Sequence, residues 1–335
     1  MRRILFVILI FSLFGCENQF DNSGNKDPLY NFDAFRTELD RNYSFFNYVD
    51  FNLDSIYSEY RQQLDDNTTE NELFQIFHNI LNLFNDAHTN IYTPLGVGGN
   101  IAYFSAFRLN QIDEIQSYFE TYNTSNRIFN YGELKDCDLG YINIRTFGEE
   151  NSNYQKFDSL LKLFQVKKGL IIDVRSNQGG FISSVKEVTS YLSDSSVEVC
   201  KYRFKNGPNH EDFSSWINFK INPAGNGHSF TKPIAVLTNR MSYSATEWFV
   251  LSVAALPNVT IVGDTTGGGS AITLTRELPN GWFLRMSNTQ TQLPDGRDFQ
   301  FTGLYPDYPV WISKADASKN KDAILETAIT LLSGN

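Results

Sequence analysis

The stretch GLIIDVRSNQGG at residues 169–180 decides the fold class of this chain. It starts as a run of apolar residues and ends in two adjacent glycines, directly before a helical pattern at residues 182–194. A near-continuous apolar run is typical of a strand in a sheet that is covered on both faces. Apolar runs and helical patterns also alternate at residues 139–165, 233–256 and 258–264. This alternation predicts an α/β fold with a mainly parallel sheet and right-handed crossovers.

The first part of the chain is helical in character. Three helical patterns occupy residues 30–46, 53–65 and 70–86. The third repeats apolar residues at three- and four-residue steps, which makes one continuous stripe: Leu73, Ile76, Phe77, Ile80, Leu81 and Phe84. We therefore expect an N-terminal helical cap over residues 30–95 and an α/β core over residues 96–335.

The N-terminus predicts export. Residues 1–15, MRRILFVILIFSLFG, combine a basic start with an apolar run too short to span a bilayer, as in a cleaved secretory signal. Residues 13–16, LFGC, resemble the lipobox of bacterial lipoproteins, although Phe14 is atypical there. We expect Cys16 to carry a lipid anchor and residues 16–29 to be a polar tether. The expected location is the cell envelope, in the periplasm or at the outer membrane; the alternative is an accidental cysteine beside a signal.

Composition excludes several classes of function. The 335 residues are 41% hydrophobic and 15% aromatic, enough for a sizeable core. The net charge of -10 becomes -12 (-10 - 2) once Arg2 and Arg3 leave with the signal, so nucleic acid is not an expected partner. Cys137 and Cys200 could pair in an oxidising compartment, but neither has metal-ligand spacing. No cofactor or metal is expected, since GGG at residues 267–269 lacks the lysine of a phosphate loop.

Ser244, in NRMSYSATE at residues 239–247, follows an apolar run and precedes a helical pattern. A serine at the start of such a helix lies at the edge of the sheet, where the N–H of Ala245 could face a developing oxyanion. The alternative is structural, because Ser244 and Glu247 have the spacing of a capping box.

Two further candidates have the same ambiguity. Gly179 and Gly180 allow close approach of the backbone to a ligand, but a pair of glycines is usually only a turn. His88, in FNDAHTNIY at residues 84–92, follows the apolar helix and could be a base, but a lone histidine is more often structural. The remaining histidines are expected to be structural: His78, His210 and His228.

In their order along the chain, these segments resemble the S41 serine peptidases, the tail-specific or C-terminal-processing protease family. The likeness runs from about residue 30 to residue 312. It joins six motifs: NDAHT, GYINIRTF, LIIDVRSNQGG, NRMSYSATE, VTIVGDTTGGG and DGRDFQFTGLYPDYPV. The resemblance implies a crotonase-like or ClpP-like α/β catalytic core.

The resemblance also implies roles for individual residues. Ser244 matches the nucleophile, and His88 matches the general base of the tricorn-like branch of the family. The N–H of Ala245, with that of Gly179 or Gly180, matches the oxyanion hole. By this mapping, His88 takes the proton of Ser244 during attack and returns it to the leaving amine.

Three departures from the family pattern affect the expected activity. Gly269 stands at the lysine position of the Ser-Lys branch, so a Ser-Lys dyad is unsupported. Gln300 stands where the tricorn-like branch has a glutamate; an amide can orient the imidazole but cannot stabilise its cation, so we expect a slower enzyme. The alternative for Gln300 is a surface glutamine. The 45 residues of 91–135 leave too little room for the PDZ domain of many family members.

The sequence therefore predicts a lipid-anchored envelope serine peptidase that cleaves polypeptides through an acyl-enzyme. One alternative is a weak or inactive binding module of the same fold, which would hold a peptide, a glycan or a hydrophobic ligand. Another alternative is an interaction subunit of a nutrient-uptake complex that docks through the aromatic-rich stretch NYSFFNYVDF at residues 42–51. The sequence indicates neither the cleavage specificity nor the oligomeric state.

Overall fold

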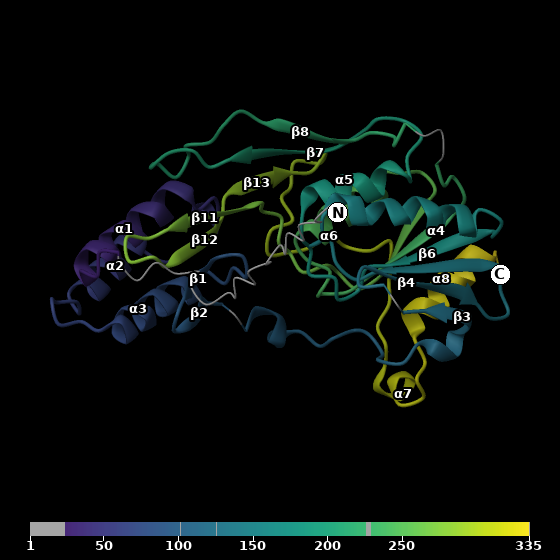
Figure 1. Cartoon of the computed structure of the whole chain (residues 1–335), viewed down its shortest axis with the longest axis horizontal. Coiled ribbons are helices and arrows are strands. Elements are labelled where there is room, and N and C mark those ends of the chain that lie inside the picture. The colour runs from purple at the N-terminus through teal and green to yellow at the C-terminus, as the bar shows by residue number, and fades with distance from the viewer. Residues whose placement is uncertain (1–23, 101, 125, 226–228, 335) are drawn as a thin grey trace, which may run out of the picture.

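The computed structural model describes residues 24–334, apart from residues 101, 125 and 226–228. The expected signal at residues 1–15, Cys16 and most of the tether lie outside the described residues. The protein is elongated, with the helical cap at one end and the α/β core at the other (Figure 1). In the described part of the chain, no helix has the length and apolar character needed to cross a membrane.

A seven-stranded sheet forms the centre of the core, which confirms the predicted α/β class. Its strands run in the order β14-β10-β9-β6-β5-β4-β3. Strands β5, β6, β9, β10 and β14 are parallel, and β4 and β3 form an antiparallel edge. Their bounds are β3 Phe119–Asn123, β4 Phe129–Leu134, β5 Leu139–Ile144, β6 Gly169–Asp173, β9 Ile234–Thr238, β10 Val259–Gly263 and β14 Tyr308–Pro309.

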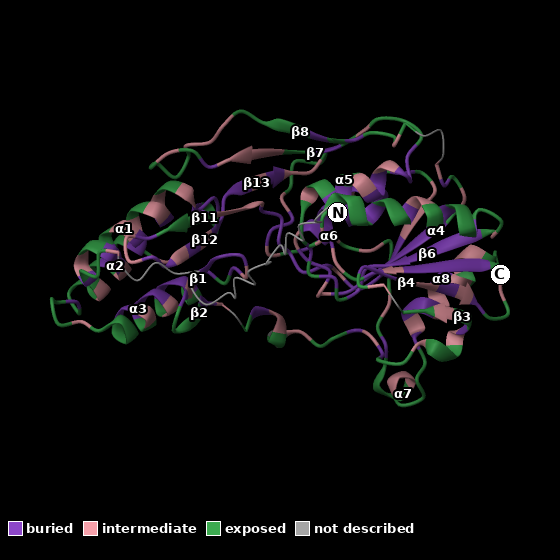
Figure 2. Ribbon diagram, in the orientation of Figure 1, coloured by how far each residue is buried: buried purple, intermediate pink, exposed green. Residues whose placement is uncertain are grey.

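Helices cover both faces of this sheet, and its central strands β5, β6 and β9 are buried (Figure 2). Leu170 and Ile172 of β6 pack into one hydrophobic cluster, while Ile171 between them packs into another. Helices α4 (Lys156–Phe164), α5 (Ile182–Ser190) and α6 (Ala245–Ala254) contribute to the first cluster. Helix α8 (Ala323–Ser333) contributes to the second. The continuous apolar run of the sequence therefore reflects burial on both faces.

The cap contains the three expected helices, α1 (Pro28–Asn42), α2 (Leu53–Arg61) and α3 (Glu70–Leu83). It also contains a four-stranded sheet of order β11-β12-β1-β2, with bounds β1 Asn90–Thr93, β2 Gly96–Gly99, β11 Thr273–Glu277 and β12 Phe283–Ser287. The chain returns to the cap because Trp282 packs edge-on against Phe77, with ring centroids 5.9 Å apart. The boundary expected at residue 95 therefore divides a sheet whose strands lie on both sides of it.

A third sheet links the two ends of the molecule. Strands β7 (Val197–Phe204) and β8 (Ile217–Ile221) form a long hairpin, and β13 (Thr289–Gln292) pairs with β7 (Figure 1). The sequence did not predict this sheet. Short helices complete the described fold: η2 Phe46–Tyr48, η3 Tyr103–Ala106, η4 Gln116–Tyr118, η5 Asn151–Gln155 and α7 Lys314–Ala317.

Burial tests two further interpretations of the sequence. Tyr43, Phe45 and Phe46 of the aromatic stretch are buried in the core of the cap, so these three side chains are not a docking surface, whereas Tyr48 is exposed. Cys137 and Cys200 are both free thiols, one partly buried and the other buried, so they do not form the disulfide that the sequence left open.

Candidate active site

Ser244 occupies a tight turn between β9 and α6. The N–H of Thr246 donates to the carbonyl of Tyr243 at 3.1 Å and closes the turn, and Ser244 has φ 59° and ψ -125°. These angles belong to the first central position of a type II′ turn, which favours glycine. Holding serine there costs about 1–3 kcal/mol. Ser244 is the N-cap of α6 and forms the capping box with Glu247 that the sequence allowed, but it lacks the extended backbone angles of an ordinary N-cap residue.

Glu247 fastens the Ser244 turn to a glycine-rich loop. Its carboxylate is fully buried and accepts from the N–H of Ser244 at 3.0 Å and from the N–H groups of Gly268 and Gly269 at 2.8 and 2.7 Å. The hydroxyl of Thr266 also donates to it, at 2.6 Å. Burial raises the pKa of Glu247 from 4.5 to about 7, against the opposing effect of these hydrogen bonds. The sequence indicated only the link to Ser244.

The glycine bend after β6 lies directly against the Ser244 turn. Gly179 has φ 100°, and a Cβ there would lie 2.8 Å from both the Cβ of Ser244 and the backbone nitrogen of Ala245. The N–H of Gly179 already donates to Oδ1 of Asn177 at 3.0 Å.

Two backbone donors remain available beside Ser244. Among the described residues, nothing accepts a hydrogen bond from the N–H of Gly180 or of Ala245. Ala245 is also the first residue of the ten-residue helix α6, whose N-terminus carries partial positive charge. Of the two glycines left open by the sequence, Gly180 is the one whose N–H has no acceptor among the described residues.

His88 lies between the end of α3 and β1. The carboxylate of Asp86 accepts from the backbone N–H of His88 at 2.9 Å and from the hydroxyls of Thr89 and Ser287 at 2.9 and 2.7 Å, which fixes the loop. The imidazole is 2% exposed and packs against the ring of Tyr243, with centroids 4.7 Å apart. The structure therefore brings His88 beside the residue that precedes Ser244.

The imidazole of His88 is held neutral and unbonded. Burial, and then the positive charge of Arg285, hold the pKa of His88 well below its usual value. Neither ring nitrogen has a hydrogen-bond partner among the described residues, so His88 is not bonded to Ser244. Catalytic hydrogen bonds are often formed only when substrate is present, so this arrangement is compatible with a base.

Gln300 does not make the expected contact with His88. It is 1% exposed, so the surface interpretation is wrong. Its Oε1, the atom expected to accept from the imidazole, accepts from the N–H and hydroxyl of Ser270 at 2.8 and 3.2 Å. Its Nε2 has no partner among the described residues. The cause is the loop at residue 270, which needs an acceptor for a buried N–H.

The structure also explains Gly269 at the lysine position of the related dyad. A Cβ on Gly269 would overlap the ring of Tyr243. The same ring is covered by Phe104 of η3, with centroids 4.8 Å apart, and the Tyr103 hydroxyl of η3 donates to the carbonyl of Gly267 at 2.9 Å. Sequence analysis missed Tyr243 and η3, since nothing in their composition marks them.

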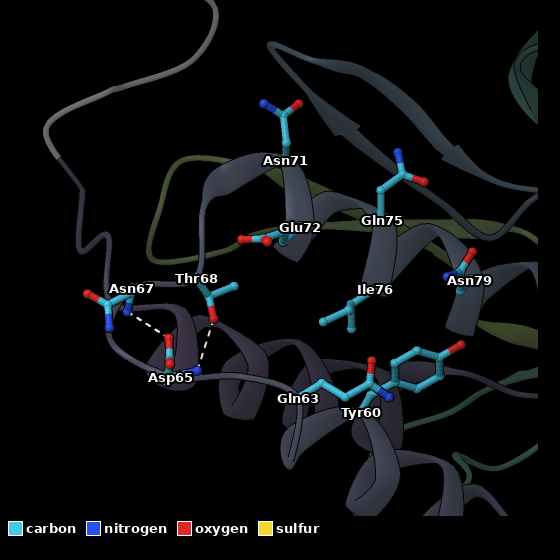
Figure 3. Close-up of a pocket in the computed structure, with 10 residues that line it drawn as sticks. All are labelled: Tyr60, Gln63, Asp65, Asn67, Thr68, Asn71, Glu72, Gln75, Ile76 and Asn79. Atoms are coloured by element: carbon cyan, nitrogen blue, oxygen red, sulfur yellow. Dashed lines mark hydrogen bonds between the residues drawn. The ribbon is translucent and has the colours of Figure 1, made fainter.

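Another concave surface lies on the cap, away from these residues. It has a volume of about 620 Å³ and is formed by the end of α2, the following loop and α3 (Figure 3). Amide side chains line much of it: Gln63, Asn67, Asn71, Gln75 and Asn79. None of the candidate catalytic residues reaches it. No group of three or more His, Cys, Asp or Glu side chains within the described ranges is placed to hold a metal ion.

Comparison with known proteins gives concordant matches. The family model "Peptidase family S41" matches residues 138–310, and the model "Tricorn protease C1 domain" matches residues 25–82. A solved structure from Parabacteroides merdae ATCC 43184 is 34% identical, covers 92% of this chain and 97% of that chain, and has a TM-score of 0.82. Mature CPAF has a TM-score of 0.73, covering 92% of this chain and 98% of that chain, at 14% identity, which shows the shared fold alone.

Similarity to curated sequences is confined to part of their length. The carboxy-terminal processing protease CtpA of Bacillus subtilis is 26% identical over 178 residues, which is 52% of this chain and 36% of the relative. The matched region is thus about a third of that protein. The S41 family model extends over Ser244 and the glycine bend, whereas His88 lies between the ranges that the two family models match.

Proposed function

This chain belongs to peptidase family S41, and we propose that it is a serine peptidase that hydrolyses polypeptides through an acyl-enzyme at Ser244. The strained turn carries the proposal. Glycine fits a type II′ position better than serine, and Glu247 already binds the backbone there, so stability alone does not call for a hydroxyl. The hydroxyl is partly exposed beside two free N–H groups, where a nucleophile is needed.

Acylation follows from this arrangement. Oγ of Ser244 attacks the carbonyl carbon of the scissile bond while its proton passes to the neutral imidazole of His88. The carbonyl oxygen becomes an oxyanion that accepts from the N–H groups of Ala245 and Gly180, and the N-terminus of α6 adds favourable electrostatics. The carbon–nitrogen bond then breaks, His88 returns the proton to the leaving amine, and the acyl-enzyme remains.

Deacylation repeats these proton transfers, with water as the nucleophile. His88 accepts a proton as the water attacks the ester carbonyl, and it gives the proton back to Oγ of Ser244 as the acid product leaves. Both half-reactions require the imidazole, which packs against the ring of Tyr243, to reach the hydroxyl of Ser244. Because Gln300 brings no charge to the imidazolium, we expect turnover slower by one or more decades than with a carboxylate partner.

We test the mechanism by fluorophosphonate labelling. Wild-type protein should label at Ser244, Ser244→Ala should abolish labelling, and His88→Ala should weaken it at least a hundredfold. The control variants Ser318→Ala and His210→Ala change exposed residues that are not part of the candidate site, so both should label normally. Undiminished labelling of Ser244→Ala would refute the assignment of the nucleophile.

We also propose that the peptidase is a lipid-anchored envelope protein, as the sequence LFGC at residues 13–16 indicates. A clickable fatty-acid analogue should label the full-length chain produced in a bacterial host, and Cys16→Ala should remove that label. Cys137→Ala is the matched control and should keep it. Equal labelling of Cys16→Ala and wild type would contradict lipidation at Cys16.

A binding module of the same fold is the second candidate. The unbonded imidazole of His88 and the engagement of Gln300 with Ser270 favour it. Fluorogenic peptide hydrolysis distinguishes the two. If wild type cleaves nothing and Gln300→Glu creates cleavage, the natural protein is a binding module; if wild type itself cleaves and Ser244→Ala does not, it is a peptidase.

A further inference from the structure

A second cavity of about 620 Å³ opens at the carboxyl ends of β5 and β6. Its lining is polar and includes Arg127, Asn130, Asn143, Arg145, Glu149 and Ser176. In parallel α/β sheets, ligands bind outside the carboxyl ends of the strands, which is also the edge that carries Ser244. The cavity therefore lies on the functional edge of the core, and no role has yet been given to it.

The cavity wall carries a guanidinium group that has no ion-pair partner in the described part of the chain. Arg145 has no ion-pair partner among the described residues. Arg127 lies 3.8 Å from Glu149, but its side chain is 90% exposed, so this pair holds neither group firmly. Arg175 is fully buried and is paired with two carboxylates, Asp173 and Asp322, so it offers no positive charge to a ligand. Against a net charge of -10, the guanidinium of Arg145 is thus available for an anion.

Hydrogen bonds connect the cavity wall to the nucleophile. The Thr146 hydroxyl in the lining lies 3.5 Å from the carbonyl of Gly179, which packs against Ser244. On the other side, the N–H of Ser176 donates to the side chain of Asn239, at the start of the loop that leads to Ser244. The cavity wall and the Ser244 turn are therefore built on adjoining backbone segments.

The geometry of the sheet gives the number of peptide residues that separate the cavity from the scissile bond at Ser244. Strand β5 is two places from β9, the strand that precedes Ser244, with β6 between them. Two strand spacings amount to about 10 Å, and an extended peptide rises about 3.3 Å per residue. A peptide that crosses this edge in extended form would thus place a side chain or terminus over Arg145 about three residues from the scissile bond.

We propose that this cavity is a substrate subsite for a carboxylate, bound by Arg145 with help from Arg127, about three residues from the cleaved bond. The inference rests on the proposed peptidase function. The carboxylate can belong to an aspartate or glutamate side chain or to the end of the polypeptide, since both offer the same planar acceptor to a guanidinium.

Quenched fluorogenic decapeptides test the proposal. A single Asp is moved along the peptide and compared with Asn at the same position, each with a free or an amidated C-terminus. Wild type should cleave one Asp peptide about fivefold better than its Asn partner in kcat/KM, the size expected of a partly exposed ion pair. A preference that survives amidation identifies the side chain as the source, and one that requires the free acid identifies the terminus.

Three variants then locate the preference. Arg145→Gln should abolish it, and Glu149→Gln should increase it because a competing negative charge leaves the cavity. Arg61→Gln in the cap is the matched control and should leave it unchanged. Equal cleavage of all Asp and Asn pairs by wild type, or a preference unchanged in Arg145→Gln, would overturn the subsite.

Binding separates this proposal from the peptidase proposal. The same peptides without quencher are titrated into Ser244→Ala protein and followed by fluorescence anisotropy. If no peptide is cleaved by wild type, yet the acidic peptide binds more tightly and loses this advantage with Arg145→Gln, the subsite stands and the peptidase function fails. If peptides are cleaved and bound without regard to charge, the subsite fails alone.

Discussion

Replacing Glu247 by glutamine should change how the stability of the protein depends on pH. Folding raises the pKa of this buried carboxyl from 4.5 to about 7. Its contribution to stability is therefore fully present below pH 4.5 and is lost as the pH rises to about 7 and beyond. At 1.36 kcal/mol per pH unit, the difference between the two pKa values corresponds to a loss on the order of 3 kcal/mol.

In the variant Glu247→Gln, the side chain at residue 247 cannot titrate, but it has one acceptor oxygen where the carboxylate has two. The amide oxygen can replace the carboxylate oxygen that binds the N–H groups of Ser244 and Gly269. The amide nitrogen then faces the hydroxyl of Thr266, which can accept, and the N–H of Gly268, which cannot. One buried N–H without an acceptor destabilises the variant by about 1–3 kcal/mol at low pH.

The assay is urea unfolding followed by tryptophan fluorescence from pH 5.5 to 8.5, above the sequence pI of about 4.9. About 2 kcal/mol of the loss at Glu247 falls in this range. The advantage of wild type over Glu247→Gln should shrink by that amount as the pH rises, because other titrating groups cancel in the difference. A difference that stays flat within about 0.5 kcal/mol would refute the raised pKa.

Three other perturbations address the site directly. Gly179→Ala should abolish fluorophosphonate labelling, because the new Cβ would meet Ser244. The control Gly296→Ala also has a positive φ but lies in open space, so it should label normally. Equal labelling of the two variants would contradict the close approach of Gly179 to Ser244. Gln300→Glu should raise kcat at least tenfold in peptide hydrolysis, and an unchanged kcat would show that this residue does not act through the base. Burial and then the charge of Arg285 depress the pKa of His88, so Arg285→Gln should raise that pKa. The acid limb of the kcat/KM profile should then move to higher pH, and an unmoved limb would exclude His88 as the titrating base.

Sequence patterns predicted the core because local order and burial coincide there. Leu170, Ile171 and Ile172 face alternate sides of one strand, and both sides are covered, so the apolar run was sufficient evidence. The cap was predicted only in part. Its sheet depends on Trp282 meeting Phe77 across 205 residues (282 - 77) of chain, and no local pattern records such a contact.

Sequence motifs placed the candidate site residues but not their hydrogen bonds. The glycine pair predicted close approach of the backbone to a ligand, and in the structure it is Ser244 that lies close to Gly179. The N–H of Gly179 donates to Asn177, and the oxygen of Gln300 accepts from the N–H of Ser270. Each bond forms because a buried N–H needs an acceptor. Such competition is settled only in the folded protein, so the sequence did not indicate that the N–H of Gly179 and the oxygen of Gln300 are already used.

Tyr243 connects these observations, because its backbone and its ring act on different parts of the site. Its N–H donates to the carbonyl of Asn177 at 3.1 Å, which ties the nucleophile turn to the glycine bend. Its ring lies between His88 and Phe104 and fills the space that a side chain at residue 269 would need. Burying both imidazole nitrogens without a bonding residue is unfavourable by about 1–3 kcal/mol per group. A hydrogen bond between the hydroxyl of Ser244 and this imidazole would recover part of that energy, so the buried base itself favours contact with the nucleophile.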